Sequence, residues 1–92
     1  MKDIEFTILM PCLNEEKTLA ECIRQAKQGA EALNLSYEIL IADNGSTDDS
    51  CRIAENEGAR VILISEKGYG NALIGGINAA KGKYIIMGDC DL

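Results

Sequence analysis

The sequence predicts an α/β fold, in which helices cover both faces of a mainly parallel four-stranded sheet to form a three-layer sandwich. Four short apolar runs are separated by segments whose apolar residues recur at helical spacing. Alternating strands and helices with short links favour right-handed crossovers and a parallel sheet. The run from Tyr37 to Ala42 is almost continuously apolar, as expected of a parallel strand covered on both faces.

Length and composition limit the possible functions. The chain has 92 residues, 47% hydrophobic and 26% charged, which fits one small globular domain. Its 15 acidic and 9 basic residues give a net charge of -6, so we expect no nucleic acid partner. The sequence has no histidine, which excludes Ser-His-Asp and Cys-His catalysis. No apolar run approaches the ~20 residues of a membrane span, and we expect reduced thiols and a cytoplasmic location.

The first strand is expected from Ile4 to Met10. Pro11 should end it, because proline cannot donate to a sheet ladder. Asn14 is a suitable N-cap for a helix from about Glu15 to Ala32, where apolar residues recur at helical spacing.

The second strand, residues 37–42, is followed by the turn cluster DNGSTD. Ser46 or Thr47 can cap a second helix, and Gly58 fits its C-terminal end. The third strand is expected from Arg60 to Ser65, on the apolar run VILI.

The last third of the chain begins with the glycine-rich loop 66–71. An apolar stripe from Leu73 to Ala80 predicts the third helix, which Gly82 should close. The run from Tyr84 to Met87 is interpreted as a short, buried fourth strand, and the tyrosines as packing residues.

Polar and glycine residues gather where the four strands end. In open parallel sheets, ligands bind beyond the carboxyl ends of the strands. The sequence therefore predicts one binding edge, built from four segments: Pro11–Glu15, Asp43–Asp48, Lys67–Asn71 and Asp89–Asp91.

Asp89 and Asp91 follow the fourth strand directly. Residues i and i+2 of an extended chain point the same way, so their carboxylates should lie together. Mg²⁺ or Mn²⁺ is the usual partner of such oxygen ligands. The alternative is a solvent-exposed turn, but the position at the binding edge favours a metal or ligand site.

Three other candidates have a structural alternative that the residues alone leave open. Asp43 either accepts hydrogen bonds from a base or ribose, or closes an Asx-turn with its own backbone. Glu15 is either a ligand or a carboxylate that favours a helix N-terminus. Lys67 either contacts a phosphate or is solvated, and its loop could bind phosphates although it is no P-loop.

Taken together, four segments resemble the inverting GT-A glycosyltransferases, and most of all the dolichyl- and polyprenyl-phosphate sugar synthases. The segments are TILMPCLNEE, ILIADNGSTDDS, EKGYGNALIGGINAAKGKYI and IMGDCDL. The resemblance covers essentially the whole chain, with the four motifs in register. It implies the Rossmann-like, nucleotide-sugar-binding half of a GT-A fold.

The resemblance implies donor-binding roles for Pro11, Leu13, Glu15, Asp43, Lys67 and Asp89. The first three would line the base and ribose, and Asp43 would bind the base.

The resemblance also implies that Asp89 and Asp91 form a DxD motif, which holds the donor diphosphate through Mg²⁺ or Mn²⁺. Two positions depart from the family pattern. Leu13 stands where an aromatic residue is common, which weakens the case for base stacking. Asn44 replaces a frequent second aspartate.

The implied reaction transfers a sugar, with inversion, from a UDP- or GDP-sugar to a polyprenyl phosphate. No catalytic residue is expected within the chain, because a base, where one is needed, should follow Leu92. Residues 1–92 are thus interpreted as a donor-binding domain truncated after the DxD motif and inactive alone. The full-length protein would work at the cytoplasmic membrane face.

An uncovered sheet edge would favour a homodimer. The alternative function is a non-catalytic nucleotide-binding or interaction module. A nucleotidyltransferase fits less well, because the acidic NEE stands where a glycine-rich, basic signature would be expected.

Overall fold

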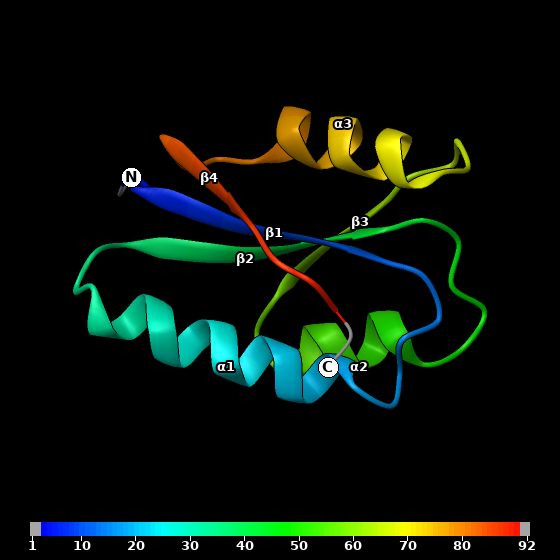
Figure 1. Ribbon diagram of the computed structural model, residues 1–92, viewed down its shortest axis with the longest axis horizontal. Coiled ribbons are helices and arrows are strands. Elements are labelled where there is room, and N and C mark those ends of the chain that lie inside the picture. The colour runs from blue at the N-terminus through cyan, green and yellow to red at the C-terminus, as the bar shows by residue number, and fades with distance from the viewer. Residues whose placement is uncertain (1–2, 91–92) are drawn as a thin grey trace.

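The computed structural model describes residues 3–90 and confirms the three-layer α/β sandwich (Figure 1). Strands and helices alternate along the chain: β1 (Phe6–Cys12), α1 (Leu19–Ala32), β2 (Tyr37–Asp43), α2 (Ser50–Asn56), β3 (Arg60–Leu63), α3 (Tyr69–Ala79) and β4 (Tyr84–Met87). All strand pairs are parallel, and the sheet order is β3-β2-β1-β4. No helix in residues 3–90 is long and apolar enough to cross a membrane.

The direction in which successive strands are added to the sheet reverses after β3. From β1 the chain builds outward through β2 to β3, and α3 then carries it back across the sheet to β4 on the other side of β1. Figure 1 shows α1 and α2 on one face of the sheet and α3 on the other. The junction of β1 and β4 is therefore the switch point at which open α/β sheets bind ligands.

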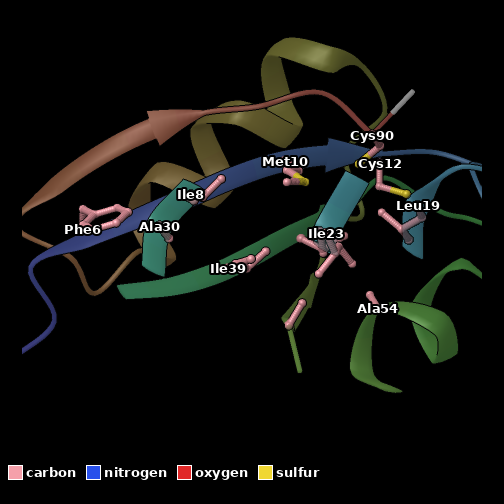
Figure 2. Packing of buried hydrophobic residues seen from close by; sticks show 12 residues of the cluster. Phe6, Ile8, Met10, Cys12, Leu19, Ile23, Ala30, Ile39, Ala54 and Cys90 are labelled. Carbon is pink, nitrogen blue, oxygen red and sulfur yellow. The ribbon is translucent and has the colours of Figure 1, made fainter. Parts of the chain in front are cut away.

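The core has one layer on each face of the sheet. Alternate side chains of β1, including Phe6, Ile8 and Met10, pack with Leu19 and Ile23 of α1 (Figure 2). On the other face, Leu9 and Leu40 pack against α3. A Cβ at Gly76 of α3 would collide with the Leu9 side chain, so this glycine lets the helix lie close to β1.

Pro11 was expected to end the first strand, but it does not. It pairs with Ala42 within β1, which continues to Cys12. The Leu9 carbonyl accepts a 2.9 Å hydrogen bond from the Gly88 amide, so Leu9 and, two residues later, Pro11 turn their backbone groups toward β4. Because β4 ends at Met87, opposite Leu9, the missing N–H of Pro11 faces no strand partner.

Two predicted helix caps are wrong. The N-cap of α1 is Thr18, not Asn14, and that of α2 is Asp49, not Ser46 or Thr47. Asn14 instead has a positive φ of 53°, and its side chain accepts hydrogen bonds from the loop after β2. The helix α1 begins only at Leu19.

The other boundaries differ in smaller ways. Gly58, with φ of 87°, directly follows the C-cap of α2 and supplies the left-handed turn expected there. The strand β3 ends at Leu63, two residues early, and α3 begins at Tyr69 within the glycine-rich loop. Gly82 does not cap α3, which ends at Ala79; it lies against the backbone of Phe6 and Thr7.

The strand β4 has the predicted bounds but is exposed, not buried. Tyr84, Ile85, Ile86 and Met87 are 67%, 37%, 47% and 57% exposed, because β4 is an edge strand beyond the helices that cover β1 and β2. The prediction that Tyr84 is a packing residue is therefore wrong. An apolar run indicates burial only where another layer covers both faces of its strand.

Candidate functional site

A cavity of about 340 Å³ opens at the switch point between β1 and β4. Its lining comes from the ends of three strands and the first turns of α3: Pro11, Cys12, Leu13, Glu15, Asn44, Tyr69, Ala72, Asp89 and Cys90. Four of the predicted site residues are thus brought to one pocket: Pro11, Leu13, Glu15 and Asp89. Asp91 lies outside the described residues.

Two predicted site residues, Asp43 and Lys67, do not line this cavity. Asp43 is 1% exposed, and its Oδ2 accepts hydrogen bonds from the amides of Gly45 at 3.1 Å and Ser46 at 2.8 Å. Its Oδ1 accepts one from the Ser46 hydroxyl at 2.5 Å. The Asx-type closure is confirmed, and contact with a base stays a prediction. Lys67 extends over Gly45, with Nζ 2.9 Å from where a Cβ would stand.

Glu15 is fixed by its backbone rather than by a helix. Its amide donates to the Ser50 hydroxyl at 3.0 Å, and its carbonyl accepts from the amides of Thr18 and Leu19. Because α1 begins only at Leu19, Glu15 is not in the first helical turn, and the helix-dipole interpretation does not apply. Its half-buried carboxylate belongs to the pocket wall.

The loops after β1 and β2 hold each other. Asn14 Oδ1 accepts the amides of Thr47 at 2.8 Å and Asp48 at 3.3 Å, while the Asn14 amide donates to the Ser46 hydroxyl at 2.8 Å. Asp48 accepts from the amides of Ser50 and Glu16, and hydrogen bonds from Ser50 lower the pKa of Asp48 below its ordinary value. These reciprocal bonds fix the pocket wall that carries Leu13 and Glu15.

Hydrogen bonds fix the backbone on both sides of Asp89. Before it, the Gly88 amide forms the bond to Leu9; after it, the Thr18 hydroxyl donates to the Cys90 carbonyl at 2.7 Å. Cys90 is buried beside Cys12 at the end of β1 (Figure 2). The hydrogen bond with Cys12, together with burial, raises the pKa of the Cys90 thiol, so this cysteine acts as an inert packing residue.

The pocket suits a cation that is shared with a bound phosphate. Within residues 3–90 no three acidic or cysteine side chains form a metal cluster, and the carboxylates that line the pocket are Glu15 and Asp89. Mg²⁺ typically takes one or two carboxylates and completes its shell with substrate phosphates and water. The donor set therefore fits an ion that arrives with an anionic ligand.

Asn44 and Tyr69 lie in the segments predicted for the binding edge but were not predicted as site residues. Tyr69, interpreted from the sequence as a packing residue, is 63% exposed at the pocket, so that interpretation is wrong. A signal was available for both, because Asn44 follows a strand directly and Tyr69 lies inside the glycine-rich loop.

A parallel α/β sheet with a pocket at its switch point places the chain in the class of open α/β domains that bind ligands at this position. The sequence model of Glycosyl transferase family 2 matches residues 7–92. The chain belongs to this family, which confirms the resemblance to GT-A glycosyltransferases and the fold that it implied.

Named relatives and solved structures agree with this assignment. A low-salt glycan biosynthesis hexosyltransferase of Haloferax volcanii is 41% identical over 92% of this chain and 20% of its own. An undecaprenyl-phosphate 4-deoxy-4-formamido-L-arabinose transferase of Klebsiella pneumoniae is 36% identical over 94% of this chain and 28% of its own.

Among solved structures, glucosyl-3-phosphoglycerate synthase of Mycobacterium tuberculosis in complex with Mn²⁺, UDP and phosphoglyceric acid is 30% identical, with a TM-score of 0.84. That match covers 97% of this chain and 34% of the synthase. The chain thus spans between a fifth and about a third of the length of these three proteins.

Proposed function

We propose that this chain is the donor-binding part of a metal-dependent, inverting glycosyltransferase that uses a nucleoside diphosphate sugar. The observation that carries the proposal is one cavity at the switch point that brings together Pro11, Leu13, Glu15 and Asp89. Solved relatives that contain Mn²⁺ with UDP or UDP-glucose support a UDP-sugar donor.

Different residues would bind different parts of the donor. Pro11 near the end of β1, and Leu13 and Glu15 on the loop that follows it, would line the base and ribose. Asp43, at the end of β2, would bind the base. Asp89, with Asp91 after it, would hold Mg²⁺ or Mn²⁺ as the DxD motif. When bound, the cation supplies Lewis-acid stabilisation for the charge that collects on the diphosphate as the sugar leaves. Lys67 would lie near the donor.

We propose a polyprenyl phosphate as the acceptor, at the cytoplasmic membrane face. The undecaprenyl-phosphate transferases among the relatives support this choice. A lipid phosphate is already ionised, so it needs less help from a general base than a hydroxyl does. The acceptor site, and a base where one is used, would come from outside residues 1–92, and we expect no transfer by this chain alone.

Calorimetric titration tests the donor site. We expect UDP to bind the 92-residue chain in the presence of Mn²⁺, and GDP to bind less tightly. The variants Asp89→Asn and Asp91→Asn should each weaken UDP binding at least ~10-fold, because each removes a charged ligand of the cation. Glu55→Gln, which removes an exposed carboxylate on α2, is the matched control.

Either of two results would contradict the donor-site proposal. One is unchanged UDP binding in the Asp89 and Asp91 variants, and the other is no binding by the wild-type chain. Binding that needs no metal would favour the alternative of a non-catalytic nucleotide-binding module.

We also propose that the exposed edge of β4 pairs with the same edge of a second copy. Across a two-fold axis, two β4 strands would meet antiparallel and self-complementary. The four residues of β4 are apolar and lack the charges or proline that usually protect an edge. An open groove of about 420 Å³, lined by Phe6, Ile8, Ala26, Ile86 and Met87 among others, extends this apolar surface toward α1.

The variant Ile85→Pro is expected to abolish this dimer and leave the sheet intact. The Tyr84 and Gly88 amides donate to β1, so by alternation the Ile85 amide faces outward, where only an added strand would use it. Sedimentation should show wild-type dimers at high concentration and at least ~10-fold weaker association for Ile85→Pro. Ile85→Val, which keeps the amide, is the control. A wild-type chain that stays monomeric at high concentration would exclude the dimer.

A further inference from the structure

Asn44, the first residue after β2, joins the tips of three strands. Its backbone amide donates to the Cys12 carbonyl of β1 at 2.9 Å. Its side-chain Nδ2 donates to the carbonyls of Glu66 at 2.8 Å and Ile64 at 3.3 Å, and its Oδ1 accepts from the Gly68 amide at 2.8 Å. The residue is 6% exposed, so these bonds are largely shielded from water.

The partners of the Asn44 side chain lead directly into the pocket. Gly68 is the N-cap residue of α3 and has φ of 118°, which a side chain would disfavour. Tyr69 and Ala72, in the first turns of α3, line the same cavity as Asn44. The position of this wall relative to Glu15 and Asp89 therefore depends on how the segment 64–68 is held.

An amide is the side chain that these partners require. Two backbone carbonyls need donors and one backbone N–H needs an acceptor, and asparagine supplies both from one planar group. An ionised aspartate has the same shape but only acceptors, so one of its oxygens would face the Glu66 carbonyl without a proton between them. The replacement of a frequent second aspartate by Asn44 thus has a structural consequence.

We propose that Asn44 is a positioning residue of the donor site, which holds residues 64–72 where α3 forms a wall of the pocket for the nucleoside diphosphate. This inference rests on the donor-binding function proposed above. Asn44 acts through the loop and α3, and its contacts are with backbone atoms, so the identity of the intervening side chains is free to vary.

Two variants of the 92-residue chain test the proposal. Asn44→Ala removes all three side-chain bonds, and Asn44→Asp keeps the shape but turns donors into acceptors. Asn78→Asp, which makes the same charge change at an exposed position of α3, is the control. Amide hydrogen exchange reports on residues 64–72, and calorimetry with UDP and Mn²⁺ reports on the donor site, at a temperature where every variant is folded.

We expect the amides of this segment to exchange at least ~10-fold faster in both Asn44 variants, with Gly68 most affected in Asn44→Ala. UDP affinity should fall at least ~10-fold in both, while Asn78→Asp stays within about twofold of wild type. Unchanged loop exchange, or faster exchange with unchanged UDP affinity, would overturn the positioning role. A wild-type chain that does not bind UDP would instead refute the donor function itself, and the role of Asn44 in it.

Discussion

Replacing Gly82 with alanine is expected to lower the free energy of unfolding by about 3 kcal/mol. A typical domain has only about 5–15 kcal/mol in total, so this loss is large. An ideal Cβ at Gly82 would lie 2.5 Å from the carbonyl carbon of Phe6 and 2.5 Å from the Thr7 nitrogen. Both atoms belong to the backbone of β1, which is paired on both sides and cannot retreat.

The alanine must therefore move residue 82 away from β1. This movement would break the 2.9 Å hydrogen bond from the Gly82 amide to the Thr7 hydroxyl and strain the start of β4, two residues later. Urea denaturation followed by circular dichroism measures the loss.

Gly29→Ala is the matched control for this experiment. A Cβ at Gly29 meets nothing within 4 Å, and the residue lies inside α1. Because alanine favours helix over glycine, this variant should gain about 0.5–1 kcal/mol. If Gly82→Ala were as stable as wild type, the close packing of the 80–83 connection on β1 would be wrong.

The second large effect is expected at Glu38, at the opposite end of the sheet from the pocket. Its carboxylate accepts hydrogen bonds from Arg60 Nε at 3.0 Å, the Thr7 hydroxyl at 2.7 Å and the Lys81 amide at 2.8 Å. The Arg60 guanidinium also donates to the Ala79 carbonyl. One side chain thus links the strands β1, β2 and β3 with the connection from α3 to β4.

Glu38→Ala should cost about 3 kcal/mol of unfolding free energy, because the buried Thr7 hydroxyl and the half-buried Arg60 lose their shared acceptor. The control is Glu57→Ala, which breaks the more exposed ion pair with Arg24 and should destabilise the fold much less. Equal losses in the two variants, measured in urea at neutral pH, would contradict a special role for the Glu38 network.

The same carboxylate should make the stability depend on pH. Burial alone would raise the pKa of Glu38, but hydrogen bonds from Arg60, Lys81 and Thr7 outweigh it and lower the pKa below the ordinary 4.5. The stabilisation is therefore fully present above pH 4.5 and is lost as the pH falls through the lower, folded-state pKa. Glu38→Gln should flatten this acid limb of the stability curve; an unchanged slope would contradict the assignment.

The strand and helix pattern could be predicted because it is local. Apolar runs and helical spacing located all the strands and helices of residues 3–90, and their alternation predicted the parallel sheet. Burial of β4 could not be predicted, because the same apolar run is compatible with a central or an edge strand. Only the strand order decides which layers cover it.

The site was predictable to the extent that it follows strand ends. Pro11, Leu13, Glu15 and Asp89 converge because parallel strands end at one edge. The sequence could not show that the Asp43 carboxylate is occupied by its own turn, or that Lys67 extends over Gly45. Asn44 was noticed as part of the segment Asp43–Asp48 and as a departure from the family pattern, but its role was not predicted, because the backbone partners of its side chain lie 20 or more residues away.

Pro11 also has a consequence for how β4 finds its place during folding. A slip of β4 by two residues toward the carboxyl end of β1 would keep every side chain on the same face, so apolar patterning would not oppose it. In that register the Ile86 carbonyl would face position 11, where proline offers no N–H. The slipped ladder would lack one of its hydrogen bonds, so the proline selects the pairing that delivers Asp89 to the rim of the sheet.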